Sequence, residues 1–289
     1  MHYEGNIFRP PSEAHSILLQ VTTGCTHNKC SFCGMYKGQK FTIKDDATIQ
    51  ADIMFAAQHC KKQRKLFLCD GDALSLPQKR LINILQLIRE HLPWVIRVGA
   101  YANSKSIYHK SDAELRLLHE LGLKIAYMGL ETGDDHTLEV INKGANAARM
   151  IEMGRKIRKA GIKLSVTVLL GIAGKERSHI HARETGRVLS AIDPDYVGAL
   201  SLMLVPGTPL YQKQLDGSFA LPGPMEMLRE IRLMLENTTL SSGLFHANHA
   251  SNYLPLKVKL PKEKEAALQL IDQALEGKIG LKPEYLRAL

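Results

Sequence analysis

Three cysteines lie within nine residues in the stretch CTHNKCSFC, from Cys25 to Cys33, with Cys30 between them. Their spacing is C-x4-C-x2-C, and thiolates this close together can hold a soft metal ion or an iron–sulfur cluster. A structural zinc site takes four ligands, usually as two pairs, whereas a 4Fe–4S cluster held by three cysteines keeps one iron open for another ligand. The triplet favours the incomplete cluster, although His27 could supply a fourth zinc ligand.

The composition is that of a globular protein that can bury a large core. The chain has 289 residues, of which 45% are hydrophobic and 23% charged, and one barrel-like domain of this size is ordinary. We expect no signal peptide and no membrane span, because no uninterrupted apolar run is long enough. Five cysteines with three of them clustered do not resemble a disulfide framework, so we expect a reducing cytoplasm.

The net charge of +9 admits two interpretations. Lysines and arginines gather at residues 61–65, at residues 155–163 and near the C-terminus. They are typical of solvated helix faces, but they could also attract an anionic substrate or a nucleic acid. Nucleic acid is the less favoured partner, because no aromatic residues interleave with the basic runs.

Apolar segments and amphipathic segments alternate along the chain. We predict strands at 17–21, 66–69, 95–101, 124–130, 162–170 and 196–205, and helices at 47–62, 77–91, 111–121, 134–142, 147–160, 178–191, 225–240 and 262–275. Near-continuous apolar strands that alternate with helices indicate parallel strands covered by helices. In such folds the chemistry lies at the carboxyl ends of the strands.

The fold class that follows is α/β, a partial (β/α)6 TIM-like barrel with a C-terminal helical extension. We expect the barrel to occupy residues 1–240 and the extension, with a possible lid and a terminal helix, to occupy residues 241–289. A doubly wound open sheet is the alternative fold, but its usual Gly-rich loop after the first strand is missing.

The polar segment GLFHANHASNYLPL, residues 243–256, is open to two interpretations. It could be a surface connection to the last helix, or it could fold over the barrel mouth. In the second case His246, His249 and Tyr253 are the candidate catalytic side chains, because two histidines three residues apart are unusual in a plain linker.

From Ile17 to Tyr211 the chain resembles the radical S-adenosylmethionine (SAM) superfamily. The cysteine loop has one residue more than the commonest spacing, C-x3-C-x2-C, of that superfamily. Gly129-Leu-Glu131-Thr-Gly133, followed by Asn142-Lys143-Gly144, is similar to a pattern of Elp3-like, MiaB-like and NifB-like members.

This resemblance implies two cofactors, a 4Fe–4S cluster and SAM. It assigns the cluster to Cys25, Cys30 and Cys33, and the backbone of Phe32 to the adenine of SAM. Asp70-Gly71-Asp72, after the second strand, is similar to the Gly-Gly-Glu element that receives the methionine amino group. Either aspartate could make that contact.

The remaining cofactor contacts that the resemblance implies follow later strands. Glu131 would bond the ribose or the amino-acid end of SAM, and Leu169 would pack on the adenine. Ser165 and Tyr101 are further cavity-lining candidates.

The activity implied is reductive cleavage of SAM to a 5′-deoxyadenosyl radical, which removes hydrogen from a substrate. From the basic charge balance and the polar segment 243–256 we expect a small polar or anionic substrate. Reduced flavodoxin or ferredoxin would supply the electron. Cys60 and Cys69 cannot hold a second three-cysteine cluster. Two alternatives stay open: a binding or electron-transfer protein with zinc or an iron–sulfur cluster but no radical chemistry, and a radical enzyme that modifies RNA.

Overall fold

The computed structural model describes residues 1–288 and divides into two compact units. We call them the first unit (Met1–Asn28, Met35–Met128 and Met153–Leu164) and the second unit (Lys29–Gly34, Gly129–Glu152 and the chain from Ser165). Their strands belong to one mostly parallel sheet of eight, in the order β1-β4-β5-β6-β7-β8-β9-β10. The predicted α/β class is therefore confirmed.

The first unit carries three parallel strands of this sheet and most of a fourth, β6. They are β1 (Ile17–Gln20), β4 (Lys65–Cys69), β5 (Arg97–Tyr101) and β6 (Leu123–Glu131), and they pair in that order. Residues Leu66 to Cys69 are at most 1% exposed, as expected of a strand covered on both faces. The strands β2 (Thr22–Thr23) and β3 (Thr42–Ile43) form a separate antiparallel pair.

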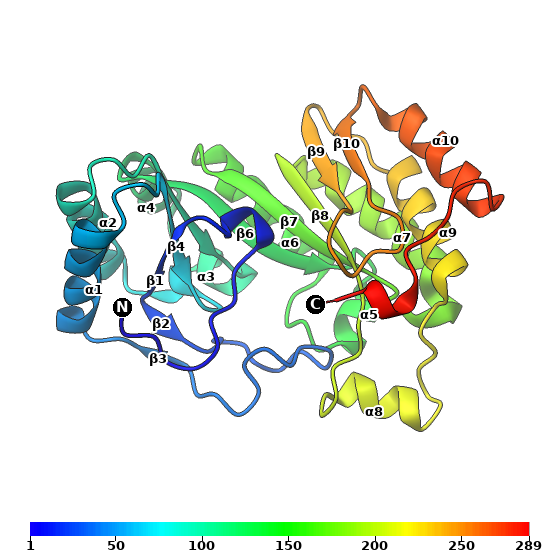
Figure 1. Ribbon diagram of the computed structural model, residues 1–289, viewed down its shortest axis with the longest axis horizontal. Helices are drawn as coiled ribbons and strands as arrows, with labels where there is room; N and C mark the ends of the chain where they lie inside the picture. Colours follow the sequence, from blue (N-terminus) through cyan, green and yellow to red (C-terminus); the bar gives the residue numbers. More distant parts are fainter. Residues whose placement is uncertain (289) are drawn as a thin grey trace. The chain divides into compact units, whose positions relative to one another are not determined.

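Helices follow the strands of the first unit (Figure 1). They are α1 (Asp46–His59), α2 (Gln78–His91), α3 (Ser104–Tyr108) and α4 (Asp112–Glu120), with the short 3-10 helices η1 (Pro11–Glu13) and η2 (Ala73–Ser75). Ser111 caps the start of α4 with the capping box that the sequence predicts. Its hydroxyl accepts a hydrogen bond from the Glu114 amide, and the Glu114 carboxylate accepts one from the Ser111 amide.

The second unit continues the sheet with β7 (Lys163–Leu170), β8 (Tyr196–Ser201), β9 (Gly243–His246) and β10 (Lys257–Leu260). β7, β8 and β9 are parallel, and β10 is antiparallel to β9. The accompanying helices are α5 (Asp135–Val140), α7 (Gly174–Ile192), α8 (Pro209–Leu215), α9 (Pro224–Glu236) and α10 (Lys264–Leu275), with η3 (Glu284–Leu286) near the end. α6 (Ala147–Lys159) has residues in both units.

Four strands were not predicted, namely the short β2 and β3 and the later β9 and β10. Residues 243–260 supply β9 and β10, whereas the sequence interpretation placed only a connection or lid before the last helix. β8 also ends at Ser201, four residues before the predicted end. No helix within residues 1–288 is long and apolar enough to span a membrane.

Candidate cofactor site at the carboxyl ends of the strands

The loops after β1 and β4 approach each other closely in the first unit. The Gly71 amide donates to the Gly24 carbonyl at 3.0 Å. A Cβ atom at Gly71 would lie 2.8 Å from the Cβ of Cys25, closer than real side chains pack. Glycine at position 71 therefore lets the Asp70-Gly71-Asp72 loop lie directly against the first cysteine.

Asp72 is a buried carboxylate, and only one of its two oxygens accepts hydrogen bonds. Its Oδ2 accepts hydrogen bonds from Thr26 Oγ1 and Asn103 Nδ2, both at 2.6 Å, while its Oδ1 is buried without a partner. Burial raises the pKa of Asp72. A carboxylate held in place on one oxygen and free on the other is suited to accept a cationic donor such as an ammonium group.

Asp70 is held differently. Its Oδ2 accepts from Gln20 Nε2 at 2.7 Å, and its Oδ1 is also buried without a partner. Burial raises the pKa of Asp70 to about 6, against the hydrogen bond from Gln20 and the charge of Lys44. Its φ of +70° is unusual for a residue other than glycine.

Tyr101, at the end of β5, belongs to an aromatic group of the first unit. Its ring meets Phe67 edge to face, with the centroids 5.1 Å apart, and lies 6.2 Å from that of Tyr127. Burial raises the pKa of its hydroxyl. The phenol is therefore neutral at physiological pH.

Phe32 and Leu169, both predicted to contact adenine, lie together in the second unit. Each packs against the apolar cluster of Ile141, Ile172, Leu202 and Leu210. The backbone of Ser31 fixes the segment, because its amide donates to the Ile141 carbonyl and its carbonyl accepts from the Leu210 amide, both at 2.9 Å. Ser165 lies on β7 on the same face as Leu169, across from Tyr196 of β8.

Glu131, the last residue of β6, forms an ion pair with Lys143 at 2.8 Å. Burial lowers the pKa of Lys143, but the charges of Glu131, Cys30 and Cys33 outweigh it and leave the pKa raised. Glu131 has a φ of +65°. Strained backbone of this kind persists where the surroundings hold it, and it gathers at functional sites.

The three catalytic candidates of residues 243–256 have different surroundings. His246 ends β9, and its Nε2 is buried without a hydrogen-bond partner. Nδ1 of His249 accepts from the Ser251 amide at 3.2 Å and contacts the Ser251 hydroxyl at 2.9 Å. Burial lowers the pKa of both imidazoles, so both are neutral near pH 7.

Tyr253 is 6% exposed and faces the end of the chain. Its hydroxyl donates to Glu284 Oε2 at 2.6 Å and accepts from Arg287 Nη1 at 2.5 Å. The Arg287 guanidinium also lies over its ring, 4.1 Å from the centroid. Tyr253 thus anchors the C-terminal segment.

Several partners of the predicted site residues were not found from the sequence. Thr26 and Asn103 hold Asp72, and Lys143 pairs with Glu131. Asn28, inside the four-residue spacer between Cys25 and Cys30, has a φ of +42° and donates from its side chain to the Tyr36 carbonyl at 2.8 Å. The lengthened spacer thus contains one residue with positive φ, a conformation that asparagine adopts more readily than most residues.

A buried polar network supports two loops of the second unit. Glu230 of α9 accepts from the Gly171 amide at 2.5 Å and from the Ser178 hydroxyl, and it lies 3.3 Å from His181 Nε2. His181 Nδ1 bonds Thr132 Oγ1 at 2.7 Å. The network therefore ties the loop after β7 to the loop after β6.

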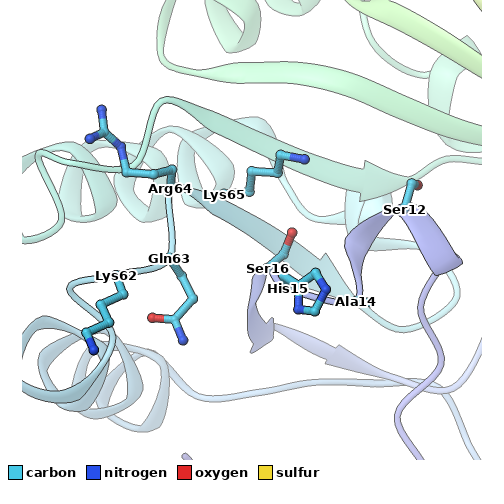
Figure 2. A pocket seen from close by; sticks show the side chains of 8 residues that line it. All are labelled: Ser12, Ala14, His15, Ser16, Lys62, Gln63, Arg64 and Lys65. Carbon is cyan, nitrogen blue, oxygen red and sulfur yellow. The ribbon is translucent and has the colours of Figure 1, made fainter.

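A cavity of about 450 Å³ lies at the opposite, amino ends of β1 and β4 (Figure 2). It is lined by Ser12, Ala14, His15, Ser16, Lys62, Gln63, Arg64 and Lys65. Parallel α/β barrels use the carboxyl ends of their strands for chemistry. The position of this cavity therefore does not favour it as the active site.

The ligand types suit an iron–sulfur cluster and SAM, although the site is not preformed as a metal site. Cys25, Cys30 and Cys33 form no disulfide and are half-buried, and Asp72 offers an unpaired oxygen. Within residues 1–288 no three histidine, cysteine or carboxylate side chains converge as metal ligands. Metal sites are commonly completed only when the metal binds.

Residues 19–183 match the family model described as the Radical SAM superfamily. The chain is 22% identical over 192 residues to the heme chaperone HemW of Bacillus subtilis, covering 66% of this chain and 49% of HemW. It is 24% identical over 295 residues to biotin synthase of Xanthomonas axonopodis, covering 96% of this chain and 81% of that enzyme. The chain thus spans about half the length of HemW.

Solved structures show the same fold at low sequence identity. Methylornithine synthase superposes with a TM-score of 0.54 at 18% identity, over 78% of this chain and 63% of that chain. The methyltransferase TsrM from Kitasatospora setae, solved with cobalamin and a 4Fe–4S cluster, gives a TM-score of 0.56 at 17% identity, over 93% of this chain and 55% of that chain.

Proposed function

The chain belongs to the radical SAM superfamily, and on that premise we propose that it is a radical SAM enzyme acting on a small polar or anionic molecule. The superfamily uses a 4Fe–4S cluster and SAM. When bound, they supply a 5′-deoxyadenosyl radical that removes a hydrogen atom from the substrate. The observation that carries the proposal is the family match over residues 19–183, which contain the triplet Cys25, Cys30 and Cys33.

Cys25, Cys30 and Cys33 are the proposed cluster ligands. They are the only three cysteines of the chain that lie within nine residues of each other. Thr26 supports this assignment, because it follows Cys25 directly and its hydroxyl bonds Asp72 at 2.6 Å. The hydrogen bond fixes the carboxylate beside the first ligand.

Asp72 is the proposed acceptor for the amino group of SAM. Its free Oδ1 and its two fixed donors on Oδ2 give it the position and the bonding capacity for a buried ammonium group. Asp70 and Gly71 shape the loop, and the Asp70 side chain is held by Gln20. Tyr101 would line the same end of the first unit.

Residues of the second unit would hold the nucleoside part of SAM. Phe32 and Leu169 share an apolar cluster suited to one face of an adenine, with Ser165 on the same strand face. Glu131, oriented by Lys143, would accept hydrogen bonds from a hydroxyl or an ammonium group. His246 is proposed to face the substrate, and His249 and Tyr253 to position the segment that carries it.

Reduced flavodoxin or ferredoxin is the proposed electron source, and the cytoplasm is the proposed location. The class of reaction, whether oxidation, group transfer or elimination, depends on the substrate. Identifying the product would therefore identify the class of reaction.

Anaerobic reconstitution tests the proposal directly. We expect about four irons per chain and formation of 5′-deoxyadenosine after SAM and dithionite are added. Cys33→Ala is the control and should lose both. A zinc protein without iron, or a cluster that leaves SAM intact, would contradict the proposal and favour a binding or electron-transfer protein.

A further inference from the structure

The sheet of the second unit has one covered face and one open face. Along β7, residues Val166, Val168 and Leu170 are at most 3% exposed, and Val197, Ala199, Phe245 and Val258 continue this buried face on the next strands. α7, α9 and α10 lie along these strands (Figure 1). The alternate residues point the other way, because successive side chains of a strand alternate between faces.

Four residues form one row across the open face. Strand register aligns Thr167 of β7 with Gly198 of β8, Gly198 with His246 of β9, and His246 with Lys257 of β10. Neighbouring strands lie about 4.8 Å apart, so the row spans about 14 Å. That length suits a small molecule with several polar groups.

Glycine leaves space in the middle of the row. A Cβ atom built on Gly198 would meet only Leu200 Cδ1, at 3.7 Å. The position is therefore open between the side chains of Thr167 and His246. A glycine inside a strand often marks a place where a ligand approaches the backbone.

The strand residues of this open face include one polar atom without a partner, and their charged side chains are all positive. His246 Nε2 is buried and makes no hydrogen bond. Lys257 is exposed and lies beside His246 in the antiparallel pair. The strand residues of this face from β7 to β10 include Lys257 and Lys259 but no aspartate or glutamate.

We propose that the row Thr167–Gly198–His246–Lys257 binds the substrate, and that the substrate carries a carboxylate or phosphate group held by Lys257. His246 forms a hydrogen bond with a polar group of the substrate next to that anion. Thr167 forms a hydrogen bond with a second polar group, and the part of the substrate between these groups lies over Gly198. This inference rests on the proposed radical function, since Leu169, assigned to the adenine, stands one pleat from Thr167, about 7 Å along β7.

Titration of small anions tests the site without depending on turnover. Inorganic phosphate and malonate are titrated calorimetrically into the reconstituted protein with SAM. We expect saturable binding of at least one of them, weakened about tenfold in Lys257→Ala, because the anion loses a charge-assisted hydrogen bond, and weakened less in His246→Gln, because His246 bonds the group beside the anion. Lys259→Ala is the matched control, on the same strand and face but in the next row, and should change the affinity less than twofold.

The two probes and an extract experiment distinguish the sources of the anion. Small molecules from a cell extract are separated on an anion exchanger, and each fraction is tested for faster 5′-deoxyadenosine formation. We expect stimulation by the retained fraction with the wild type and not with Lys257→Ala. Loss of the stimulation after phosphatase treatment identifies a phosphate ester, and its persistence identifies a carboxylate.

The outcomes separate this inference from the proposed function. Absent anion binding, equal binding by all variants, or stimulation only by the unretained fraction would overturn the substrate site, even where SAM is cleaved. Selective anion binding without any SAM cleavage would instead overturn the radical function and leave an anion site.

Discussion

The ammonium group of Lys143 lies 2.8 Å from a carboxylate oxygen of Glu131, and both side chains are largely buried. Lys143 also lies within the electrostatic reach of Cys30 and Cys33, whose negative charges raise its pKa. One cation thus orients a proposed SAM contact and offsets the charge of two proposed cluster ligands. This gives Lys143 two separable roles.

Replacing Lys143 by methionine should affect both roles. The Glu131 carboxylate would be left buried without its partner, which costs about 3–5 kcal/mol when a buried pair is broken. The reconstituted cluster should have a more negative midpoint potential, because a nearby positive charge is lost. Chemical denaturation measures the loss of stability, and a redox titration followed by electron paramagnetic resonance measures the midpoint potential.

The control is Lys143→Arg, which keeps the positive charge and should keep the midpoint potential of the cluster. An unchanged potential in Lys143→Met would contradict the electrostatic role.

The two aspartates of the Asp70-Gly71-Asp72 loop should differ in their effect on SAM binding. Asp72→Asn removes the charge of a carboxylate that Thr26 and Asn103 hold in place. We expect SAM affinity to fall about 10- to 100-fold, the range for a charge-assisted hydrogen bond. Asp70→Asn should change it less than threefold.

The measurement is the SAM-dependent change in the spectrum of the reduced cluster, at equal iron content. Asn103→Ala provides an intermediate case, because it leaves Asp72 charged but less firmly held. A larger loss in Asp70→Asn than in Asp72→Asn would reverse the assignment.

Local patterns were sufficient to predict most of the fold. The alternation of apolar strands and helices gave the α/β class, and Ser111 and Glu114 marked the start of α4 through a capping box that forms as expected. β9 was missed because its four residues gain their stability from pairing with β8, more than forty residues earlier in the chain. Such pairing has no local signal.

The site was predicted less completely for a similar reason. Motif residues such as Asp72 and Glu131 stand out because they follow strands, but their partners come from distant segments. Asn103 lies 31 residues from Asp72 along the chain, and Lys143 lies 12 residues from Glu131. Tyr253 was predicted as catalytic from its polar neighbourhood, whereas its hydrogen bonds with Glu284 and Arg287 depend on where the C-terminal segment returns.

Asp70 should make the stability of the apoprotein depend on pH. Its pKa rises from 3.8 to about 6 on folding, mainly through burial. Between pH 3.8 and about 6 the folded protein binds more protons at Asp70 than the unfolded chain does, so the free energy of unfolding falls as the pH rises. The destabilisation that comes from burying the charged carboxylate is fully present above about pH 6. Asp70→Asn removes this cost and should melt at a higher temperature than the wild type at pH 7.5.

The difference should shrink toward pH 4.5, where Asp70 of the folded wild type is protonated. Thermal melting of both proteins at the two pH values measures it. Glu265→Gln, at an exposed position of α10, should leave the melting temperature unchanged at both. A constant difference between Asp70→Asn and wild type would show that the side chain does not titrate in this window.

Tyr253 should matter for stability rather than for the cleavage of SAM. Its hydroxyl bonds both Glu284 and Arg287, and Arg287 also donates to the Ser251 carbonyl at 2.6 Å. Tyr253→Phe should lower the free energy of unfolding by about 1–2 kcal/mol, since Arg287 and Glu284 keep each other as partners. Arg287→Ala should cost more and should expose the C-terminal segment to limited proteolysis. Both variants should form 5′-deoxyadenosine at the wild-type rate. If Tyr253→Phe keeps full stability but forms no product from a substrate that the wild type converts, Tyr253 takes part in the reaction itself.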